Sequence, residues 1–245
     1  MSQEEQRIRY PRRLLIRKIL RGLDWLALAL LTKLEILGRE NCPAKGPLIV
    51  VANHFHFADP VLMVRVAPWP LDFWGGFNMP NAPAYLTFIP KMWGFYPVHR
   101  GAYSRQAIRA GEEVLKQEGV LGIFPEAGNW ADVLRRPRRG TAFLAARTGA
   151  PLLPMGFDGL DAIFPSLRRG RRAKVTARIG KVFGPFTAPE EGPERRQRIR
   201  EIGDEIMRHI AALIPPEKRG VYSKDPAARA IAEQYEYPFA QNPDI

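Results

Sequence analysis

Hydrophobic residues near the start of the chain recur at a spacing that is typical of a helix. Five of them stand three or four residues apart, which places them on one side of a helix. They are Leu15, Ile19, Leu23, Leu26 and Leu30. The other side carries Arg13, Arg17 and Arg21. Since Pro11 is compatible with a first helical turn, the pattern predicts an amphipathic helix over residues 11–37.

This apolar stripe has two interpretations, which can hold for different parts of the helix. It can pack on a protein core, or it can lie in a membrane interface with Trp25 and the leucines in the acyl boundary and the arginines on anionic headgroups. The apolar run from Trp25 to Leu31 is much shorter than the roughly 18–20 residues of a membrane span. The charged first residues also lack the apolar core of a secretory leader. We therefore expect neither a transmembrane helix nor a leader.

Further along, short apolar runs alternate with amphipathic segments. Strands are predicted at residues 48–53, 71–76, 120–126, 151–157 and 173–183. Helices are predicted at residues 60–67, 103–118, 139–150 and 193–214, with short ones within 78–93 and near 226–234. Such alternation predicts an α/β fold, with a mostly parallel or mixed central sheet covered by helices and an N-terminal amphipathic, membrane-associating helical element.

We divide the chain into three parts on this basis. Residues 1–40 form the N-terminal helical segment, residues 41–215 the α/β domain and residues 216–245 a C-terminal tail. A chain of 245 residues is long enough for one such domain with a substantial core.

Positive charge is the unusual feature of the composition. The chain has 37 Lys and Arg against 25 Asp and Glu, a formal net charge of +12, which favours polyanionic partners. The clusters RRPRR at 135–139 and RRGRRAK at 168–174 can be solvated loops or can bind anionic headgroups. No nucleic-acid motif or aromatic platform accompanies them, so we expect an anionic membrane surface rather than nucleic acid. The single cysteine, Cys42, excludes an internal disulfide.

The segment ANHFHFADP at 52–60 carries the candidate chemistry. His54, His56 and Asp59 could hold a metal, since two histidines and a carboxylate are a known ligand set. Only two further histidines exist and the cysteine lies elsewhere, so we expect no metal. Alternatively, Asp59 caps a helix whose first residue is Pro60, and the histidines are only hydrogen-bonded.

The third interpretation is a catalytic pair. If the strand ends at Asn53 and the chain turns, the side chains of His54 and Asp59 can meet. A carboxylate that accepts from one ring nitrogen leaves the other nitrogen as a base, and strand ends are where α/β proteins place their chemistry. No serine lies in a G-x-S-x-G elbow. The pair therefore suits activation of a substrate hydroxyl better than a covalent acyl-enzyme.

Four motifs in this order resemble the sequence blocks of the glycerolipid acyltransferases related to 1-acylglycerol-3-phosphate acyltransferase. The resemblance covers about residues 35–185. The motifs are N-H-x-x-x-x-D at 53–59, GFYPVHRG at 94–101, IFPEAGNW at 123–130 and GAPLLPMGF at 149–157.

The resemblance implies a reaction and a set of residue roles. A fatty acyl chain moves from acyl-CoA or acyl carrier protein to the hydroxyl of a lysophospholipid, most commonly 1-acylglycerol-3-phosphate, without a cofactor. His54 is the implied general base and Asp59 orients it. Arg100 resembles the arginine that holds the acceptor's phosphate. The implied substrate-binding residues are Asn53, Arg100, Glu126 and Gly128. The implied location is the cytoplasmic face of the cell membrane, as a peripheral or monotopic protein.

Three departures from the family pattern qualify these roles. Asn129 stands where an arginine is usual, Ala127 where a glycine is usual, and His99 where an aspartate commonly precedes the arginine. The missing arginine indicates a non-phosphate acceptor, such as a glycolipid or lyso-amino lipid, or compensation by the arginines at 135–139. A further alternative is a non-catalytic basic lipid-binding module. His56 has no implied role, and we expect it to shape the pocket.

Overall fold

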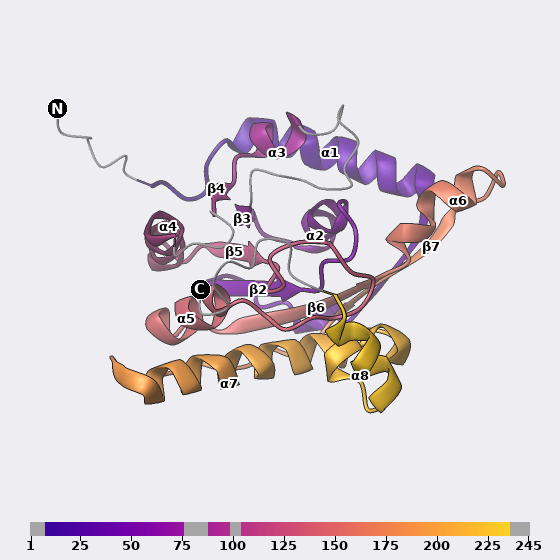
Figure 1. The fold of residues 1–245 in the computed structure, drawn as a ribbon. Helices are drawn as coiled ribbons and strands as arrows, with labels where there is room; N and C mark the ends of the chain where they lie inside the picture. Colours follow the sequence, from indigo (N-terminus) through magenta and orange to yellow (C-terminus); the bar gives the residue numbers. More distant parts are fainter. Residues whose placement is uncertain (1–7, 76–87, 99–103, 236–245) are drawn as a thin grey trace.

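The computed structural model describes residues 8–75, 88–98 and 104–235, and all structural statements concern these residues. They form a seven-stranded sheet with helices on both faces, in the order β1-β7-β6-β2-β5-β3-β4 (Figure 1). Neighbouring strands run parallel except β6 and β7, which are antiparallel. The predicted α/β fold with a mixed central sheet is confirmed.

Most elements lie close to predicted segments. The exceptions are β1, described below, and the short elements β4 and α6, which were not predicted. The strands are β1 Thr32–Leu37, β2 Leu48–Ala52, β3 Asp72–Gly75, β4 Tyr96–Pro97, β5 Val120–Ile123, β6 Leu152–Asp158 and β7 Ala173–Ile179. The helices are α1 Leu14–Leu31, α2 Asp59–Val66, α3 Phe88–Trp93, α4 Arg105–Lys116, α5 Arg139–Thr148, α6 Ile163–Leu167, α7 Gly192–Ala211 and α8 Pro226–Glu233.

Strand β2 lies at the centre of the sheet and is fully buried along its length. Because side chains alternate across a strand, Leu48 and Val50 join the core beneath α1 and α2. Ile49 and Val51 join the core beneath α4, α5 and α7. Both faces of the sheet are covered, which explains why this strand has a continuous apolar sequence rather than an alternating one.

The loops that matter for function meet at one edge of the sheet. Strands β5 and β6 are parallel to β2, so all three end at the same edge. Strand β7 is antiparallel to β6 and therefore begins there, and β1, parallel to β7, begins there too. We call this the carboxyl edge. It brings together the loops that follow β2, β5 and β6, the C-terminal end of α1 and the start of β7.

The predicted helix over residues 11–37 is wrong over its last six residues. Helix α1 ends at Leu31, and Thr32–Leu37 form β1. Thr32 is extended, and its hydroxyl donates to the Leu28 carbonyl at 2.6 Å. From there Thr32, Leu34 and Ile36 are the less exposed positions of an alternating pattern, a period of two that the helical spacing before it obscured.

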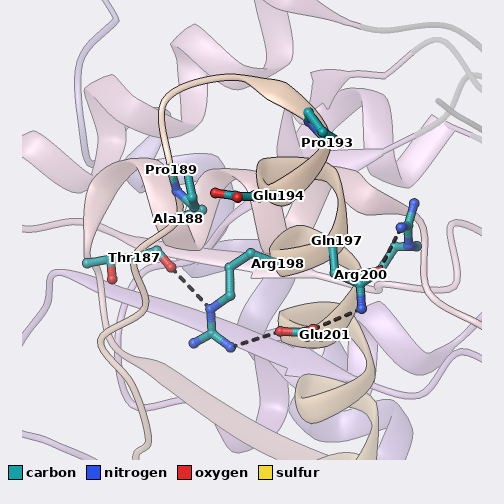
Figure 2. Close-up of a pocket in the computed structure, with 9 residues that line it drawn as sticks. All are labelled: Thr187, Ala188, Pro189, Pro193, Glu194, Gln197, Arg198, Arg200 and Glu201. Atoms are coloured by element: carbon teal, nitrogen blue, oxygen red, sulfur yellow. Dashed lines mark hydrogen bonds and ion pairs between the residues drawn. The ribbon is translucent and has the colours of Figure 1, made fainter.

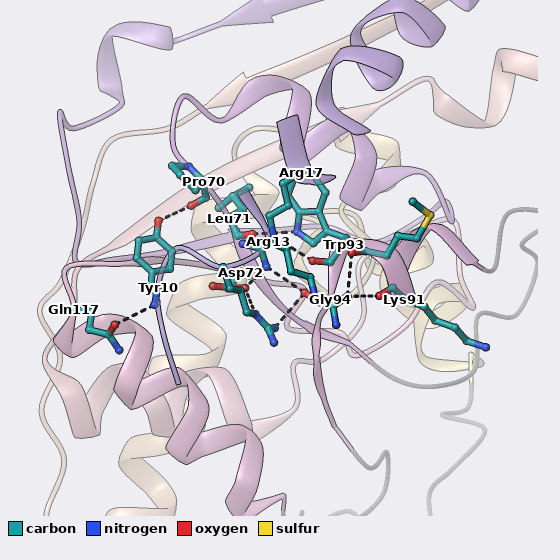
Figure 3. Close-up of polar contacts among 12 residues, drawn as sticks. Tyr10, Arg13, Arg17, Pro70, Leu71, Asp72, Lys91, Trp93, Gly94 and Gln117 are labelled. Carbon is teal, nitrogen blue, oxygen red and sulfur yellow. Dashed lines mark hydrogen bonds and ion pairs between the residues drawn. The ribbon is translucent and has the colours of Figure 1, made fainter. Parts of the chain in front are cut away.

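Helix α1 turns its apolar side outward. Leu15 is 73% exposed and Leu30 64%, whereas Arg17 is buried. Arg17 forms an ion pair with buried Asp72 and donates to the Trp93 carbonyl at 3.1 Å, so the polar side of the helix faces the protein (Figure 3). The interpretation in which this leucine stripe packs on the core is therefore wrong. None of the helices in the described ranges is long and apolar enough to cross a bilayer.

Candidate active site

The turn between β2 and α2 brings His54 and Asp59 together at the carboxyl edge. The Nδ1 atom of His54 lies 2.9 Å from Oδ2 of Asp59. The predicted approach of these two side chains is thus confirmed. Pro60 lies in the first turn of α2 as predicted, where its missing N–H costs no helical hydrogen bond.

Asp59 is buried and points back into the turn rather than capping the helix. Its Oδ2 also accepts from the His56 backbone N–H at 2.7 Å. Ala58 occupies the position before the helix, and no side chain caps its first turn. The alternative in which Asp59 is only a helix cap is therefore wrong. Two donors on one carboxylate oxygen hold this side chain in a single orientation.

The His54 ring has one nitrogen bound and one nitrogen available for chemistry. With Asp59 as the acceptor, Nδ1 carries the proton, and Nε2 keeps the lone pair of a base. The ring stacks on Phe124, with centroids 4.4 Å apart and planes inclined by 28°. The side chain is 14% exposed. The imidazole is thus fixed by a hydrogen bond and a ring contact while one edge remains accessible. Phe124, part of the FPE sequence after β5, is a positioning contact that the motif comparison did not single out.

Glu126 ties the His54 turn to the loop that follows β5. One carboxylate oxygen accepts from the His54 N–H at 3.0 Å and the other from the Arg135 N–H at 3.0 Å. Burial raises the pKa of Glu126 to about 7, although the Arg135 charge and the two backbone donors favour the ionised form. Both oxygens are used within the protein, so its predicted contact with the acceptor stays a prediction.

Asn53 joins the ends of two neighbouring strands. It is fully buried; its Nδ2 donates to the Phe157 carbonyl at 2.9 Å and its Oδ1 accepts from the Phe157 N–H at 2.8 Å. These bonds fix the backbone immediately before His54. A direct contact between Asn53 and substrate stays a prediction, and Arg100 and His99 lie outside the described residues.

The turn at 126–130 shows why a glycine is usual at position 127, and it adds a contact. Ala127 has a φ of 60°, in the left-handed region, which is where a glycine is favoured. A Cβ at Gly128 would lie 1.8 Å from Cζ3 of Trp130. The Trp130 ring therefore packs closely against Gly128, a contact that was not predicted, and a contact between Gly128 and substrate stays a prediction. The Gly128 carbonyl accepts from the Arg135 guanidinium.

His56 lies next to the pair but is oriented differently. Its Nδ1 accepts from the Ala58 N–H at 3.3 Å, and burial lowers the pKa of its ring. Across the described part of the chain, no cluster of three His, Cys, Asp or Glu side chains could bind a metal ion.

Two hollows lie on the α7 side of the molecule. One, of about 430 Å³, has buried Glu126 in its wall. Its other lining residues are Arg135, Arg136, Pro137, Arg138, Arg139, Ile199, Arg200, Gly203, Asp204, Val221, Ala232, Glu233 and Tyr235. The RRPRR cluster thus lines a cavity that reaches the residue bonded to the His54 backbone.

The second hollow, of about 870 Å³, lies between residues 187–189 and the first turns of α7 (Figure 2). It contains neither member of the His54–Asp59 pair. Arg198 in this hollow forms an ion pair with Glu201 at 3.5 Å and donates to the Thr187 carbonyl at 3.4 Å. We assign no chemistry to it.

Comparison with known proteins identifies the family. The model of the Acyltransferase family matches residues 33–158, which is half of the chain and includes the His54 turn and the Glu126 loop. This chain belongs to the Acyltransferase family. The match ends with β6, so α7 and α8 lie beyond it.

Two curated relatives are 1-acyl-sn-glycerol-3-phosphate acyltransferases. That of Borreliella burgdorferi is 28% identical over 136 residues, which is 54% of each chain. A chloroplastic one from Brassica napus is 26% identical over 144 residues, 56% of this chain and 41% of the relative. The aligned part thus spans about half the length of these relatives.

A solved structure supports the fold. It is that of the 1-acyl-sn-glycerophosphate acyltransferase PlsC from Thermotoga maritima, with a TM-score of 0.53 and 22% identity over 77% of both chains. The α/β arrangement described above is therefore shared with a known member of this group.

Proposed function

We propose that this chain transfers a fatty acyl group from a thioester to the hydroxyl of 1-acylglycerol-3-phosphate. The observation that carries the proposal is the His54–Asp59 pair, 2.9 Å apart, in which Asp59 binds Nδ1 and leaves Nε2 of a 14% exposed side chain as the base. The activities named for the two curated relatives support the same acceptor.

The reaction balances with this pair alone. Nε2 of His54 takes the proton of the acceptor hydroxyl while its oxygen forms a bond to the thioester carbonyl carbon. Asp59 stabilises the resulting imidazolium. The carbon–sulfur bond then breaks, and the thiolate leaves with the proton from Nε2. The products are the ester and a free thiol, and the proposed reaction uses neither a metal nor a cofactor.

The acceptor's phosphate needs cationic groups. We assign the phosphate contact to Arg100 and to the arginines at 135–139 that line the cavity beside Glu126. Guanidinium groups suit this role because they bind phosphate oxygens in pairs. Asn129, which stands where an arginine is usual, is buried. Because of this departure, a non-phosphate acceptor is the second candidate. The donor is acyl-CoA or acyl carrier protein.

The orientation of α1 supports work at a membrane surface. Its exposed leucines match an interfacial helix, whose apolar side lies in the boundary between headgroups and acyl chains. We therefore propose peripheral or monotopic attachment to the cytoplasmic face of the cell membrane, with an anionic membrane surface as partner. A lipid acceptor could then reach the carboxyl edge from the bilayer.

The first test measures thiol release from acyl-CoA in the presence of lysophosphatidic acid micelles. We expect acceptor-dependent release by the wild type and a loss of about 10²–10⁴-fold in kcat for His54→Gln, because the general base is removed. The matched control is His209→Gln, since His209 stacks on Phe183 at 3.8 Å and is not part of the pair. It should retain activity.

A panel of acceptors and donors separates the alternatives. Release only with a glycolipid or lyso-amino lipid would replace the phosphate acceptor by the second candidate. Release only with acyl carrier protein would identify the donor. A folded wild type that binds vesicles but turns over no acceptor with either donor would contradict catalysis and favour a lipid-binding module.

A further inference from the structure

Helix α6 and the residues after it form a compact exposed projection, which we call the α6 tip (residues 163–172). The helix ends in a turn in which the Gly170 N–H donates to Leu167 at 2.9 Å and the Arg171 N–H to Ser166 at 3.0 Å. Gly170 has a φ of 64°, as this helix-ending motif requires. The projection is therefore an ordered structure rather than a loose loop. Phe164 is 45% exposed and Leu167, three residues later on the same side, 40%.

The α6 tip concentrates positive charge that the protein does not neutralise. Arg168, Arg169 and Arg171 are exposed, and none of them forms an ion pair within the described residues. No acidic residue occurs between 162 and 174. The nearest one before it, Asp161, lies 3.7 Å from Lys218. Like charges this close repel one another, so their arrangement around apolar side chains fits an anionic, partly apolar surface.

The α6 tip adjoins the C-terminal end of α1. Arg172 donates through Nε to the carbonyl of Thr32, which follows α1, at 2.9 Å. Ala173 pairs with Thr32 where β7 and β1 begin. Figure 1 shows α6 beside this end of α1. There Leu26 and Leu30 are 50% and 64% exposed. Two apolar surfaces from distant parts of the sequence are thus side by side.

The position of the α6 tip relative to the chemistry follows from the sheet. Strand β7 begins at the carboxyl edge, where β2 ends and His54 follows. Asp161, just before α6, is close enough for its charge to act on the His56 ring. The tip and the His54 turn therefore lie at the same edge of the sheet.

We propose that the α6 tip is a second docking surface of this chain, specific for a bilayer that contains anionic phospholipid. Phe164 and Leu167 enter the boundary between headgroups and acyl chains, and Arg168, Arg169 and Arg171 bind headgroup phosphates. Together with α1, this contact holds the bilayer against the carboxyl edge. The inference rests on the proposed function in one respect, that the acceptor is a membrane lipid.

The test is co-sedimentation with vesicles of phosphatidylcholine alone and of phosphatidylcholine with phosphatidylglycerol. The variant R168A/R169A/R171A keeps Arg172, which binds the Thr32 carbonyl. We expect its partition coefficient on the anionic vesicles to fall at least tenfold, because each basic residue near such a surface contributes substantially to binding. On phosphatidylcholine alone it should match the wild type.

The matched control is R196A/R208A/K224A, which removes the same charge from exposed positions on α7 and just before α8. It should change anionic binding by less than about twofold. Equal losses in the two triple variants would overturn the proposal in favour of general charge attraction. No loss in the first variant would overturn it as well.

A second variant tests the apolar part of the contact. Phe164→Ser/Leu167→Ser should weaken binding to both kinds of vesicle several-fold, and unchanged binding would contradict insertion of these side chains. Acceptor-dependent thiol release in detergent micelles should be normal in all three variants. A wild type without thiol release would contradict the proposed function but leave the vesicle measurements as a separate result.

Discussion

Helices α1 and α7 cover opposite faces of the same sheet (Figure 1). They differ in whether the apolar or the polar side of the helix faces the sheet. Helix α7 buries its apolar side, including Ile202, Ile206 and Ile210, and exposes its charges. Helix α1 buries Arg17, Asp24 and Leu28 and exposes the leucines of its outer stripe, such as Leu15 and Leu30. The hydrophobic effect therefore holds α7 on the sheet. Helix α1 packs only Leu28 fully into the core, and ion pairs and hydrogen bonds to the sheet and to α3 hold its inner side.

The difference indicates that the two faces meet different surroundings. An amphipathic helix in water lowers its free energy by turning its apolar side inward. Helix α1 does the reverse, and exposed apolar side chains gathered on one side of a helix are typical of an interaction site. The polar contacts beneath α1 fix its orientation, so the apolar stripe faces outward in a defined position.

The largest expected effect comes from placing a carboxylate on the apolar side of each helix. Ile206→Asp in α7 should lower the free energy of unfolding by more than about 4 kcal/mol, because it buries an unpaired charge in the core. Leu23→Asp in α1 should change it by less than about 0.5 kcal/mol, because Leu23 is 59% exposed. Urea unfolding measures both.

Vesicle binding should depend strongly on Leu23, the position of the two that contributes little to stability. Leu23→Asp should lower the partition coefficient about tenfold or more, since burying a leucine in an apolar phase contributes roughly 1.5–3 kcal/mol. Comparable losses of stability at Leu23 and Ile206 would contradict the contrast between the helices.

The sequence predicts the sheet better than it predicts the orientation of α1. The apolar runs of β2, β5 and β6 become buried strands because any covered parallel sheet requires such runs. The leucine spacing of α1 identifies a helix and its two sides. It contains no information on which side faces the protein, because that depends on Asp72, a residue distant in sequence that pairs with Arg17 and Arg12.

The second expected effect concerns the ion pairs of the two helices. Arg17→Ala should destabilise the protein by about 3 kcal/mol, because it leaves fully buried Asp72 with only the partly exposed Arg12. Arg198→Ala in α7 should cost less than about 1 kcal/mol, because its partner Glu201 is about half exposed.

The double variant Arg17→Met/Asp72→Asn sharpens this test. It removes both buried charges and should recover part of the stability lost in Arg17→Ala, since a buried charge is most costly when it is unpaired. Equal losses at Arg17 and Arg198 would mean that the contacts beneath α1 do not hold it.

The active-site pair was predictable for a different reason. His54 and Asp59 are five residues apart, so a strand end followed by a helix start is enough to bring them together. The contacts of Glu126 with the His54 N–H and of Phe124 with the His54 ring depend on the pairing of β2 with β5. The IFPEAGNW motif marks Glu126 in the sequence. Its burial and its two backbone donors become apparent only when the strands are assembled.

The last contrast between the helices is a pH dependence carried by Asp24 on the inner side of α1. Burial raises its pKa to about 7 from its ordinary value of 3.8, against the influence of Arg65 and Arg21. Within the described residues neither carboxylate oxygen has a hydrogen-bond partner. The folded state therefore holds this proton more tightly than the unfolded state. Stability present below pH 4 is lost as the pH rises to about 7.

Asp24→Asn removes this titration and makes the comparison with α7 quantitative. Relative to the wild type, the free energy of unfolding of Asp24→Asn should rise by up to about 4 kcal/mol between pH 4 and pH 8. Glu201→Gln, at a half-exposed position of α7, is the matched control. Urea unfolding at pH 4, 6 and 8 measures the difference. If the difference in free energy of unfolding between Asp24→Asn and the wild type does not change with pH, Asp24 is ionised in the folded protein. The inner side of α1 would then stabilise its charge as well as water does.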